Sequence, residues 1–291
     1  MAESISKTHK VEPEKEKVSV IVFSKNRAWQ LSEYLRTLYK YLEETVDLKI
    51  YVIYKADSIF RPSYSALRST YINVIFIEET DFKSDLLFVI NNIKTEFCLF
   101  GVDDVLFYRK FNLIDACDLL QMDYNIVSYS LRLNPNITYC QPANTYFTPP
   151  TLYTSDKQYM EWRWLTAAGD WNYPWEVSAS LYRLCNIKDL VKYLVKNCPE
   201  KLQHPNTFEA MGAIIAPLLF CQQASSCCQN KAVCSTITIN RVQDLYPNTI
   251  YEEKSIEYLD TLFWERKEYN EEYYRNKVFN SIHIGDFVLK D

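Results

Sequence analysis

The stretch that decides the fold is Val18–Arg27, VSVIVFSKNR. Its first part, VSVIVF, is a run of β-branched and apolar residues without alternation, which is typical of a strand buried on both faces of a parallel sheet. A polar turn, Ser24–Arg27, follows, and leucines then recur at positions 31, 35, 38 and 42. This helical spacing predicts an amphipathic helix directly after the turn.

Strands and helices continue to alternate beyond this unit. We expect strands at 48–54, 72–77 and 97–100, and a helix at 85–93 with one apolar face. Alternation of this kind predicts an α/β fold with a mainly parallel central sheet flanked by helices. In such sheets ligands bind beyond the carboxyl ends of the strands, so the residues that follow each strand are the first candidates for a site.

The pattern changes after about residue 125. Strands are expected at 125–133 and 233–241, helices at 187–196, 206–219 and 256–277, and a long loop at 134–154. We find no internal repeat and no linker, and therefore expect one domain over 18–291. Its parts are a Rossmann-like nucleotide half at 18–125, a mixed α+β acceptor half at 126–250 and a C-terminal helical segment at 251–291. Residues 1–17 mix Lys and Glu without an apolar stretch, which predicts a disordered lead-in and no signal peptide.

Composition excludes several classes of protein. The chain has four glycines, at positions 101, 169, 212 and 285, so neither a P-loop nor a dinucleotide-binding fingerprint can exist in it. A net charge of −5 with well-mixed signs argues against a nucleic acid partner. The longest apolar run, Met211–Cys221, is broken by Pro217 and is too short to be a transmembrane segment. We therefore expect a cytoplasmic protein, of a host or of the producing cell.

Nine cysteines include no CxxC pair. The cluster Cys221, Cys227, Cys228 and Cys234 matches no common zinc spacing, so we interpret it mainly as small buried hydrophobes in a reducing compartment. The 23 tyrosines and six tryptophans either fill the core or form surfaces for a carbohydrate or protein.

Two polar sites follow predicted strands. Asp103 and Asp104 come directly after the apolar run FCLFG, and adjacent carboxylates are costly unless a cation lies beside them. Mg²⁺ or Mn²⁺ with a substrate diphosphate would fit, and the alternative is a solvated turn that caps the next element. The turn Ser24–Arg27 either caps its helix or holds a ligand, and Arg27 suits a phosphate and an ion pair equally well.

Several segments together resemble nucleotide-sugar glycosyltransferases of GT-A type. They are VIVFSKNR at 20–27, YKAD at 54–57, DFKSDL at 81–86 and the strand ending in VDDV at 102–105. GDWNYP at 169–174, SLYR at 180–183, PNTFEA at 205–210 and NRVQ at 240–243 resemble segments of small bacterial and large-virus members. The resemblance covers roughly 18–248. The acidic motif reads Val-Asp-Asp, so the first carboxylate of a full DxD motif is absent.

The resemblance implies roles for individual residues. The nucleotide-sugar would contact Ser24, Asn26, Arg27, Ala56, Asp57, Lys83, Val102 and Asp103. The metal, Mn²⁺ or Mg²⁺, would be bound by Asp104, with His204 as a further ligand. Lys83 and His204 are otherwise plain surface residues.

An inverting transfer needs a carboxylate that takes the proton from the acceptor hydroxyl. The candidates are Asp170, Glu209 and Glu176. Glu209 is alternatively the capping-box acid of the next helix, and Glu176 an exposed strand residue. Trp171 and Trp175 would stack on the acceptor sugar, or else pack in the core.

The predicted function is a metal-dependent glycosyltransferase, inverting, that moves a sugar from a nucleotide-diphosphate sugar, a UDP-sugar being favoured, to a saccharide acceptor. One alternative is a nucleotidyltransferase, although no glycine-rich loop follows the first strand. The other is a non-catalytic carbohydrate- or protein-binding module on a degenerate transferase fold.

Overall fold

The computed structural model describes residues 18–43, 48–154, 159–242 and 253–291. The expected lead-in at 1–17 and Gln243 of the NRVQ segment lie outside the described residues. In the described part of the chain, no helix combines the length and the apolarity that crossing a membrane would require.

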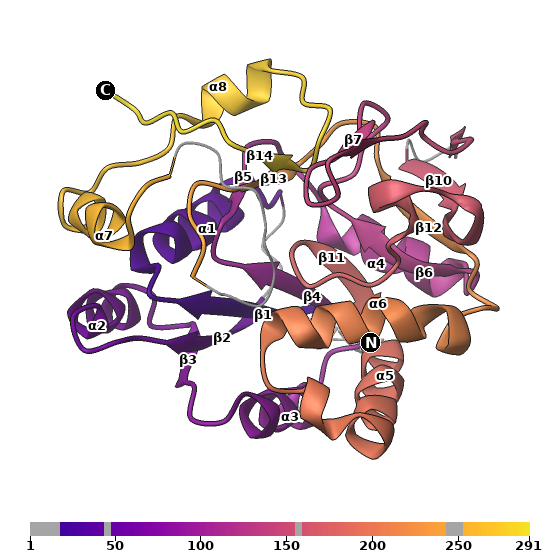
Figure 1. Cartoon of the computed structure of the whole chain (residues 1–291), viewed down its shortest axis with the longest axis horizontal. Helices are drawn as coiled ribbons and strands as arrows, with labels where there is room; N and C mark the ends of the chain where they lie inside the picture. The colour runs from indigo at the N-terminus through magenta and orange to yellow at the C-terminus, as the bar shows by residue number, and fades with distance from the viewer. Residues whose placement is uncertain (1–17, 44–47, 155–158, 243–252) are drawn as a thin grey trace, which may run out of the picture.

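Strands and helices alternate through the first half, as predicted (Figure 1). The elements are β1 Val18–Lys25, α1 Ala28–Tyr41, β2 Lys49–Lys55, α2 Arg61–Thr70, β3 Ile75–Glu78, α3 Phe82–Asn92 and β4 Phe97–Val102. The four strands are parallel and lie in the order β3-β2-β1-β4. Their carboxyl ends therefore meet at one edge of the sheet, where the turn after β1 and the acidic pair after β4 lie.

The second half continues the same sheet. Its larger elements are α4 Leu113–Met122, β6 Ile126–Ser130, β10 Tyr159–Arg163, β11 Ser180–Arg183, α5 Leu184–Asn197, α6 Pro205–Leu219 and β12 Ser225–Gln229. Strand β11 lies between β4 and β6 and is antiparallel to both, whereas β12 is parallel to β6 and β10 antiparallel to β12. The nine-stranded sheet β3-β2-β1-β4-β11-β6-β12-β10-β9 is thus parallel at one end and mixed at the other. This confirms the α/β class.

Smaller elements complete the molecule. They are β5 Val105–Phe107, β7 Tyr139–Cys140, β8 Thr145–Tyr146, β9 Tyr153–Thr154, β13 Cys234–Ile237, β14 His283–Ile284, α7 Ile256–Trp264 and α8 Glu271–Asn276, with 3₁₀ turns η1 Trp164–Thr166, η2 Gly169–Asn172 and η3 Pro199–Lys201. β5, β13 and β14 form a second, three-stranded sheet. β5 follows the acidic pair directly, and the Ile237 backbone N–H of β13 donates to the Asp104 carbonyl at 2.8 Å, so the small sheet holds the backbone of the pair.

Two helices, α2 and α4, are absent from the sequence-based expectations. In α2 the buried residues are Ser63, Tyr64 and Leu67, so its apolar pattern is too sparse to stand out. The start of α3 is better marked, because Asp81 accepts a hydrogen bond from the Ser84 backbone N–H at 2.9 Å and caps the helix.

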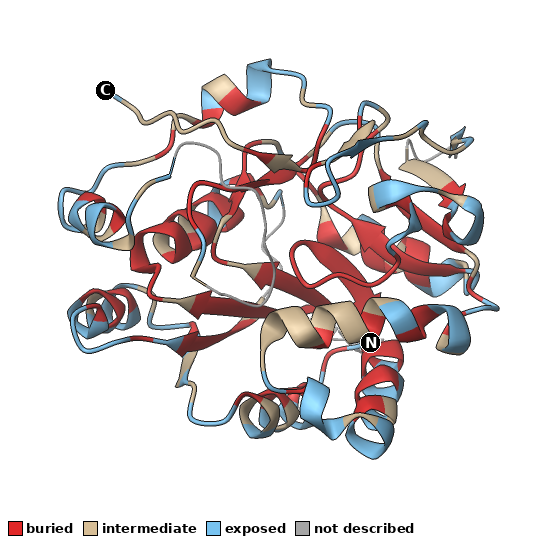
Figure 2. Ribbon diagram, in the orientation of Figure 1, coloured by how far each residue is buried: buried red, intermediate tan, exposed pale blue. Residues whose placement is uncertain are grey.

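Strand β1 alternates its side chains between two apolar cores, one on each face of the sheet. Val18, Val20 and Val22 belong to a core covered by α1, α2 and α4, and Ile21 and Phe23 to one covered by α3, α5 and α6. Figure 2 shows β1 and its neighbours β2 and β4 as almost entirely buried, which explains why β1 reads as a continuous apolar run.

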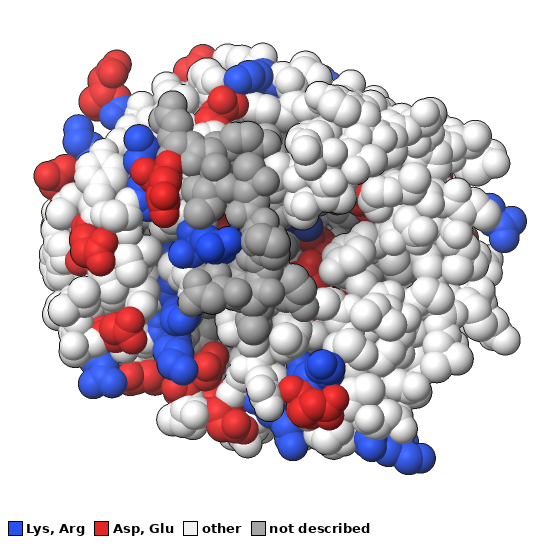
Figure 3. Space-filling model, viewed as in Figure 1, with Lys and Arg blue, Asp and Glu red and all other residues white. Residues whose placement is uncertain are grey.

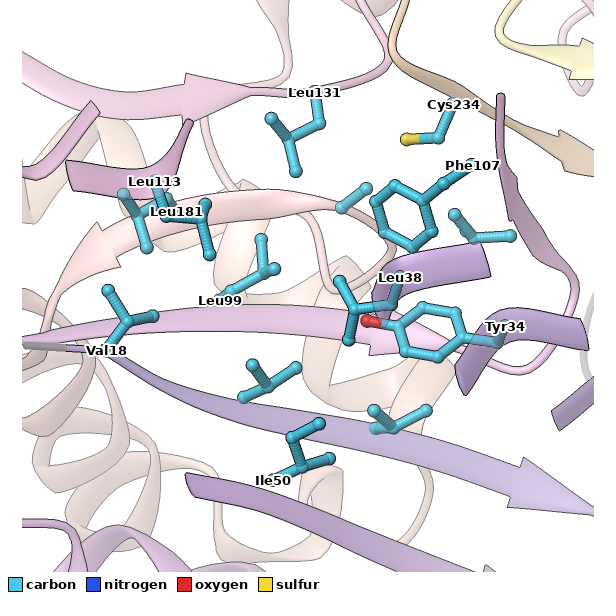
Figure 4. Packing of buried hydrophobic residues seen from close by; sticks show 14 of the residues in the cluster. Val18, Tyr34, Leu38, Ile50, Leu99, Phe107, Leu113, Leu131, Leu181 and Cys234 are labelled. Atoms are coloured by element: carbon cyan, nitrogen blue, oxygen red, sulfur yellow. The ribbon is translucent and has the colours of Figure 1, made fainter. Parts of the chain in front are cut away.

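Gly101 in β4 allows a close approach from α1. A Cβ atom at this position would lie 2.2 Å from the Tyr34 hydroxyl oxygen. Figure 4 shows the Tyr34 ring lying over the strands beside Leu38 and Leu99. Glycine at 101 therefore lets an aromatic ring pack against the strand that ends in the acidic pair.

Cys227, Cys228 and Cys234 are buried, which confirms them as small core residues, but Cys221 is exposed. All nine cysteines are free thiols. Burial raises the pKa of the Cys228 and Cys234 thiols, so neither is disposed to ionise.

Candidate functional site

The turn after β1 is held by an Asn–Asp pair. Asn26 has a φ of +55°, a left-handed conformation that asparagine tolerates better than most residues. Its side-chain Nδ2 donates to Asp57 Oδ2 at 2.7 Å, and the Asp57 backbone N–H donates to Asn26 Oδ1 at 2.8 Å. The loops that follow β1 and β2 are thus locked together at the carboxyl edge of the sheet.

A tyrosine from α2 supports the same turn. The Tyr64 hydroxyl lies 2.6 Å from Ser24 Oγ and accepts a hydrogen bond from the Arg27 backbone N–H at 3.0 Å. Tyr64 is fully buried, and burial raises the pKa of its hydroxyl beyond its ordinary range, so it remains protonated. Ser24 therefore lies at the predicted edge of the sheet, and its hydroxyl points into the protein toward Tyr64.

Arg27 connects this turn to the acidic pair. Its Nη1 donates to Asp103 Oδ1 at 3.1 Å and to Asp104 Oδ2 at 3.0 Å, and its Nη2 donates to the Asn240 carbonyl at 2.7 Å. Asp103 also accepts from the Lys25 backbone N–H at 3.2 Å. Of the two readings given for Arg27, the ion pair is the one present here. We call Arg27, Asp103 and Asp104 the Arg27 cluster.

The Arg27 cluster contains one cation for two carboxylates. Burial raises the pKa of Asp103, and the neighbouring Asp104 charge adds to this, although Arg27 opposes both effects. Asp104 Oδ1 is buried and has no hydrogen-bond partner. A buried carboxylate oxygen without a partner is costly, so the cluster is suited to a further cation at this oxygen.

Within the described residues, no three His, Cys, Asp or Glu side chains gather in a way that could hold a metal ion. At the Arg27 cluster, Asp104 Oδ1 is a carboxylate oxygen that no hydrogen bond occupies. This fits a cation that takes one carboxylate from the protein and its other ligands from water and a substrate phosphate.

A second arginine organises the acceptor half. Arg132, just after β6, donates through Nη2 to Glu176 Oε2 and through Nη1 to Thr236 Oγ1, the latter at 2.8 Å. The other Glu176 oxygen accepts from the Ser180 hydroxyl at 2.5 Å and from the Ala179 backbone N–H at 3.1 Å. We call Arg132 and Glu176 the Arg132 pair.

The Arg132 pair corrects two expectations for Glu176. Both of its carboxylate oxygens are used inside the protein and the residue is 5% exposed, so it is neither an exposed strand residue nor free to accept a substrate proton. Its role in this structure is to compensate a buried guanidinium.

Glu209 and Asp170 lie near the Arg132 pair without joining it. Burial raises the pKa of Glu209 to about 7, with Asp104 adding to the rise, while Arg132 and a hydrogen bond from Tyr173 oppose it. Glu209 is half-buried. Glu209 thus feels the charges of both Arg132 and Asp104.

The carboxylate of Asp170 is buried beside a small cavity. Its Oδ1 accepts from the Cys140 thiol at 3.3 Å, its Oδ2 is buried without a partner, and burial raises its pKa. It lines a small cavity of about 20 Å³, large enough for one water molecule. Asp170 therefore faces this internal cavity.

His204 begins α6. Its Nδ1 accepts a hydrogen bond from the Asn206 backbone N–H at 3.1 Å, as an N-cap. Partial burial lowers its pKa, and the positive charges of Lys25 and Lys55 lower it further. The neutral ring then carries its proton on Nε2, so neither nitrogen has a lone pair free for a metal. His204 nevertheless lies at the predicted edge, opposite these two lysines.

Trp171 and Trp175 are both fully buried, at 0% exposure. Trp171 Nε1 donates to the Ile137 carbonyl at 2.9 Å, and Trp175 packs edge-on against Phe208. The expectation that these rings stack on an acceptor sugar is wrong for this structure, because no face of either ring is accessible. The core interpretation holds instead.

The remaining predicted residues lie at the sheet edge. Ala56 is buried and Asp57 exposed directly after β2, Val102 is half-buried at the end of β4, and Lys83 is half-buried in the first turn of α3. The hydrogen bonds and ion pairs described for the Arg27 cluster do not include the Lys83 side chain.

Sequence reasoning missed Tyr64, Arg132 and Asn240 as parts of the site. Arg132 falls inside the strand predicted at 125–133, so it was not placed at a strand end, whereas in the structure β6 already ends at Ser130. Tyr64 and Asn240 could not be found from strand ends, because they reach the cluster only through the packing of α2 and of the segment after β13.

Charged side chains are distributed unevenly around this edge. On the face that Figure 3 shows, Lys, Arg, Asp and Glu side chains gather over the left of the view, and few lie over the upper right, where β7, β10 and β12 are labelled in Figure 1. Exposed tyrosines of the acceptor half include Tyr146, Tyr153 and Tyr173. An uncharged surface with exposed tyrosines is suited to a neutral, hydroxyl-rich ligand.

No family model matches the chain. The chain is 32% identical over 307 aligned residues to the bifunctional glycosyltransferase pgtA of Dictyostelium discoideum. The match covers 94% of this chain but only 39% of the relative, so the chain spans about two fifths of that protein. The expected resemblance to glycosyltransferases is confirmed at this level.

Two solved structures share a lower similarity with the chain. The mannosyltransferase PcManGT from Pyrobaculum calidifontis, in complex with GDP-Man and Mn²⁺, has a TM-score of 0.39 at 16% identity, over 60% of this chain and 46% of its own. S. aureus TarS 1-349 in complex with UDP has a TM-score of 0.46 at 15% identity, over 75% and 59%.

Proposed function

We propose that this chain is a glycosyltransferase that moves a sugar from a nucleotide-diphosphate sugar to a saccharide acceptor. The observation that carries the proposal is the Arg27 cluster, which lies at the carboxyl edge of a parallel sheet in a chain related over 94% of its length to a glycosyltransferase. This is the edge at which α/β proteins bind ligands.

In this proposal the donor lies along the ends of β1, β2 and β4. The Asn26–Asp57 pair would position the nucleoside, while Ser24, Arg27 and Asp103 would line the ribose and diphosphate. Lys83, Ala56 and Val102 would form the rim. A UDP-sugar is the first donor to test.

The proposed cation is Mn²⁺ or Mg²⁺, bound by Asp104 Oδ1 and by donor phosphate oxygens. Such an ion supplies Lewis-acid stabilisation of the charge on the leaving diphosphate. Arg27 contributes a fixed positive charge beside the same carboxylates, so the residues of this chain hold the pair in one orientation before the donor binds. His204 is not part of the proposed metal shell.

Glu209 is the proposed base of an inverting transfer. Its pKa of about 7 suits a group that accepts a proton near neutral pH, and the Asp104 charge reaches it from the donor side. Asp170 is the second candidate, but it faces an internal cavity. Tyr173, an exposed tyrosine hydrogen-bonded to Glu209, supports a neutral saccharide as acceptor.

The test is a panel of UDP-, GDP- and TDP-sugars, assayed for hydrolysis and transfer with Mn²⁺ and with EDTA. We expect one donor to react, and Asp104→Asn to reduce the rate by about 100-fold or more, as for loss of a group that stabilises transition-state charge. Asp115→Asn, an exposed acid in the first turn of α4, is the matched control and should react normally.

Two results would refute the proposal. One is the absence of binding by every donor in calorimetry. The other is unchanged activity in Asp104→Asn. Full activity in EDTA would refute only the proposed dependence on Mn²⁺ or Mg²⁺.

A further inference from the structure

A large pocket lies on the opposite edge of the sheet from the candidate active site. Its volume is about 470 Å³, within the range of about 300–1,000 Å³ that small-ligand sites occupy. It lies at the amino end of β6 and along α5 from Asn186 to Asn197, whereas the Arg27 cluster lies beyond the carboxyl ends of the strands. The lining residues come from the loop before β6, from α5 and from the end of α6.

Two buried amides form part of this pocket. Asn186 and Gln223 are 3% and 4% exposed, and Asn186 Nδ2 donates to Gln223 Oε1 at 2.8 Å while Gln223 Nε2 donates back at 3.3 Å. Each side-chain NH₂ uses one of its two hydrogens in this pair. The mutual pair fixes the orientation of both amides in the lining of the pocket.

One wall of the pocket is an aromatic ring on a rigid support. Tyr124 is 61% exposed, and the Arg183 guanidinium lies 5.1 Å from its ring centroid. Arg183 donates to the carbonyls of Ile126 at 2.6 Å and Asp123 at 2.7 Å, on either side of the tyrosine. The ring is therefore held in place with much of its surface open to a ligand.

The facing wall carries unbalanced positive charge. Lys192 and Lys196 lie one turn apart on α5 and both line the pocket, and the ion pairs described in the structure include neither. Like charges at this spacing repel each other slightly in a helix. Asp189 is the single acid in the lining, so the pocket keeps a net positive charge.

We propose that this pocket is a second binding site, separate from the candidate active site, and that it takes a short acidic saccharide. The open face of Tyr124 would pack against a sugar ring, and the amides of Asn186 and Gln223 would bind hydroxyls. Lys192 and Lys196 would bind the carboxylate or phosphate of the sugar. This site does not depend on the proposed transferase activity, so either proposal can fail alone.

The test measures binding by calorimetry and ligand-observed NMR on the full chain. The probes are trigalacturonic acid, a hyaluronan tetrasaccharide, neutral maltotriose and inorganic phosphate. We expect an acidic oligosaccharide to bind with an affinity that falls as salt is added, and maltotriose and phosphate to bind much more weakly.

Variants locate the site. Lys192→Glu combined with Lys196→Glu should weaken binding about tenfold or more, as expected for lost charge-assisted hydrogen bonds. Tyr124→Ala should weaken it about fivefold. Lys188→Glu, an exposed lysine of α5 outside the pocket, is the matched control, and Asp104→Asn should bind the acidic probe normally.

Any of the following outcomes would overturn the inference. The first is that neither acidic probe binds at millimolar concentration, and the second is that maltotriose binds as well as they do. The third is that the Lys192/Lys196 variant, still folded by circular dichroism, binds the acidic probe as Lys188→Glu does. Loss of acidic-probe binding in Asp104→Asn would place the ligand at the other edge and would also refute a separate site.

Discussion

The two halves of the molecule each place a buried arginine at the carboxyl edge of the sheet, but the two arginines have different surroundings. In the Arg27 cluster one guanidinium faces two carboxylates and leaves Asp104 Oδ1 without a partner. In the Arg132 pair one guanidinium faces one carboxylate whose oxygens are all bonded.

The difference indicates a difference in role. A buried pair with one carboxylate for one guanidinium, and with both carboxylate oxygens bonded, fixes the structure around it, and removing one partner is costly. An unbalanced cluster retains charge that a ligand can neutralise, which is typical of a functional site. Arg27 would thus position groups for the donor, while Arg132 holds the acceptor half together beneath Glu209.

The largest effect is expected from breaking the balanced pair. Arg132→Met should lower the free energy of unfolding by about 3–5 kcal/mol, because Glu176 would be left as a buried charge without its partner. Denaturant unfolding measures this. Arg61→Ala, which breaks the exposed Arg61–Glu78 pair, is the control and should cost less than about 1 kcal/mol.

Arg27→Met sharpens the same comparison. The remaining carboxylates can take up a divalent cation, so Mn²⁺ should raise the melting temperature of this variant more than that of Arg132→Met. An equal response of the two variants to Mn²⁺ would mean that the Arg27 cluster has no greater tendency to bind a cation than the Arg132 pair.

A smaller effect is expected from the two glycines beneath these regions. A Cβ atom at Gly101 would lie 2.2 Å from the Tyr34 hydroxyl, and one at Gly212 would lie 2.1 Å from Trp175 Nε1. Either Gly→Ala change should destabilise the protein by about 1–3 kcal/mol through overpacking.

Their functional effects should separate. Gly101 lies two residues before Asp103, so Gly101→Ala should raise the KM for the donor. Gly212 lies one turn after Glu209, so Gly212→Ala should mainly reduce kcat. Steady-state kinetics with varied donor distinguishes these results, and a reversed pattern would contradict the assignment of the two halves.

The smallest effect is a pH dependence at Glu209. Its pKa is raised from 4.5 to about 7, so activity should fall below about pH 7 as the base is protonated. Between pH 4.5 and about pH 7, Glu209 in the folded chain also keeps a proton that it has already released in the unfolded chain. The free energy of unfolding should therefore decline as pH rises from 4.5 to about 7.

Glu209→Gln should remove the acidic limb together with most of the activity, and should flatten the decline in stability. The matched variant is Asp170→Asn. If that variant loses the acidic limb and Glu209→Gln keeps it, Asp170 is the base.

Much of the fold followed from local patterns. The apolar run of β1 and the leucines of α1 predicted a buried strand and an amphipathic helix, because side chains repeat every two residues in a strand and every 3.6 in a helix. The same logic located the turn at Ser24–Arg27 and the acidic pair. The weakly apolar α2 carried no such signal, so Tyr64 was missed.

The sequence by itself determined which residues end the strands, and the scarcity of glycine excluded two kinds of nucleotide site. Only the tertiary structure decided which of those residues meet. Arg27 and Asp103 are 76 positions apart, and they touch because β1 and β4 are neighbours in the sheet. The insertion of β11 between β4 and β6 likewise brings Glu176 to Arg132. Periodicity is a local property, whereas burial and ion pairing depend on strand order, so the roles of the tryptophans and of Glu176 could be assigned only from the folded chain.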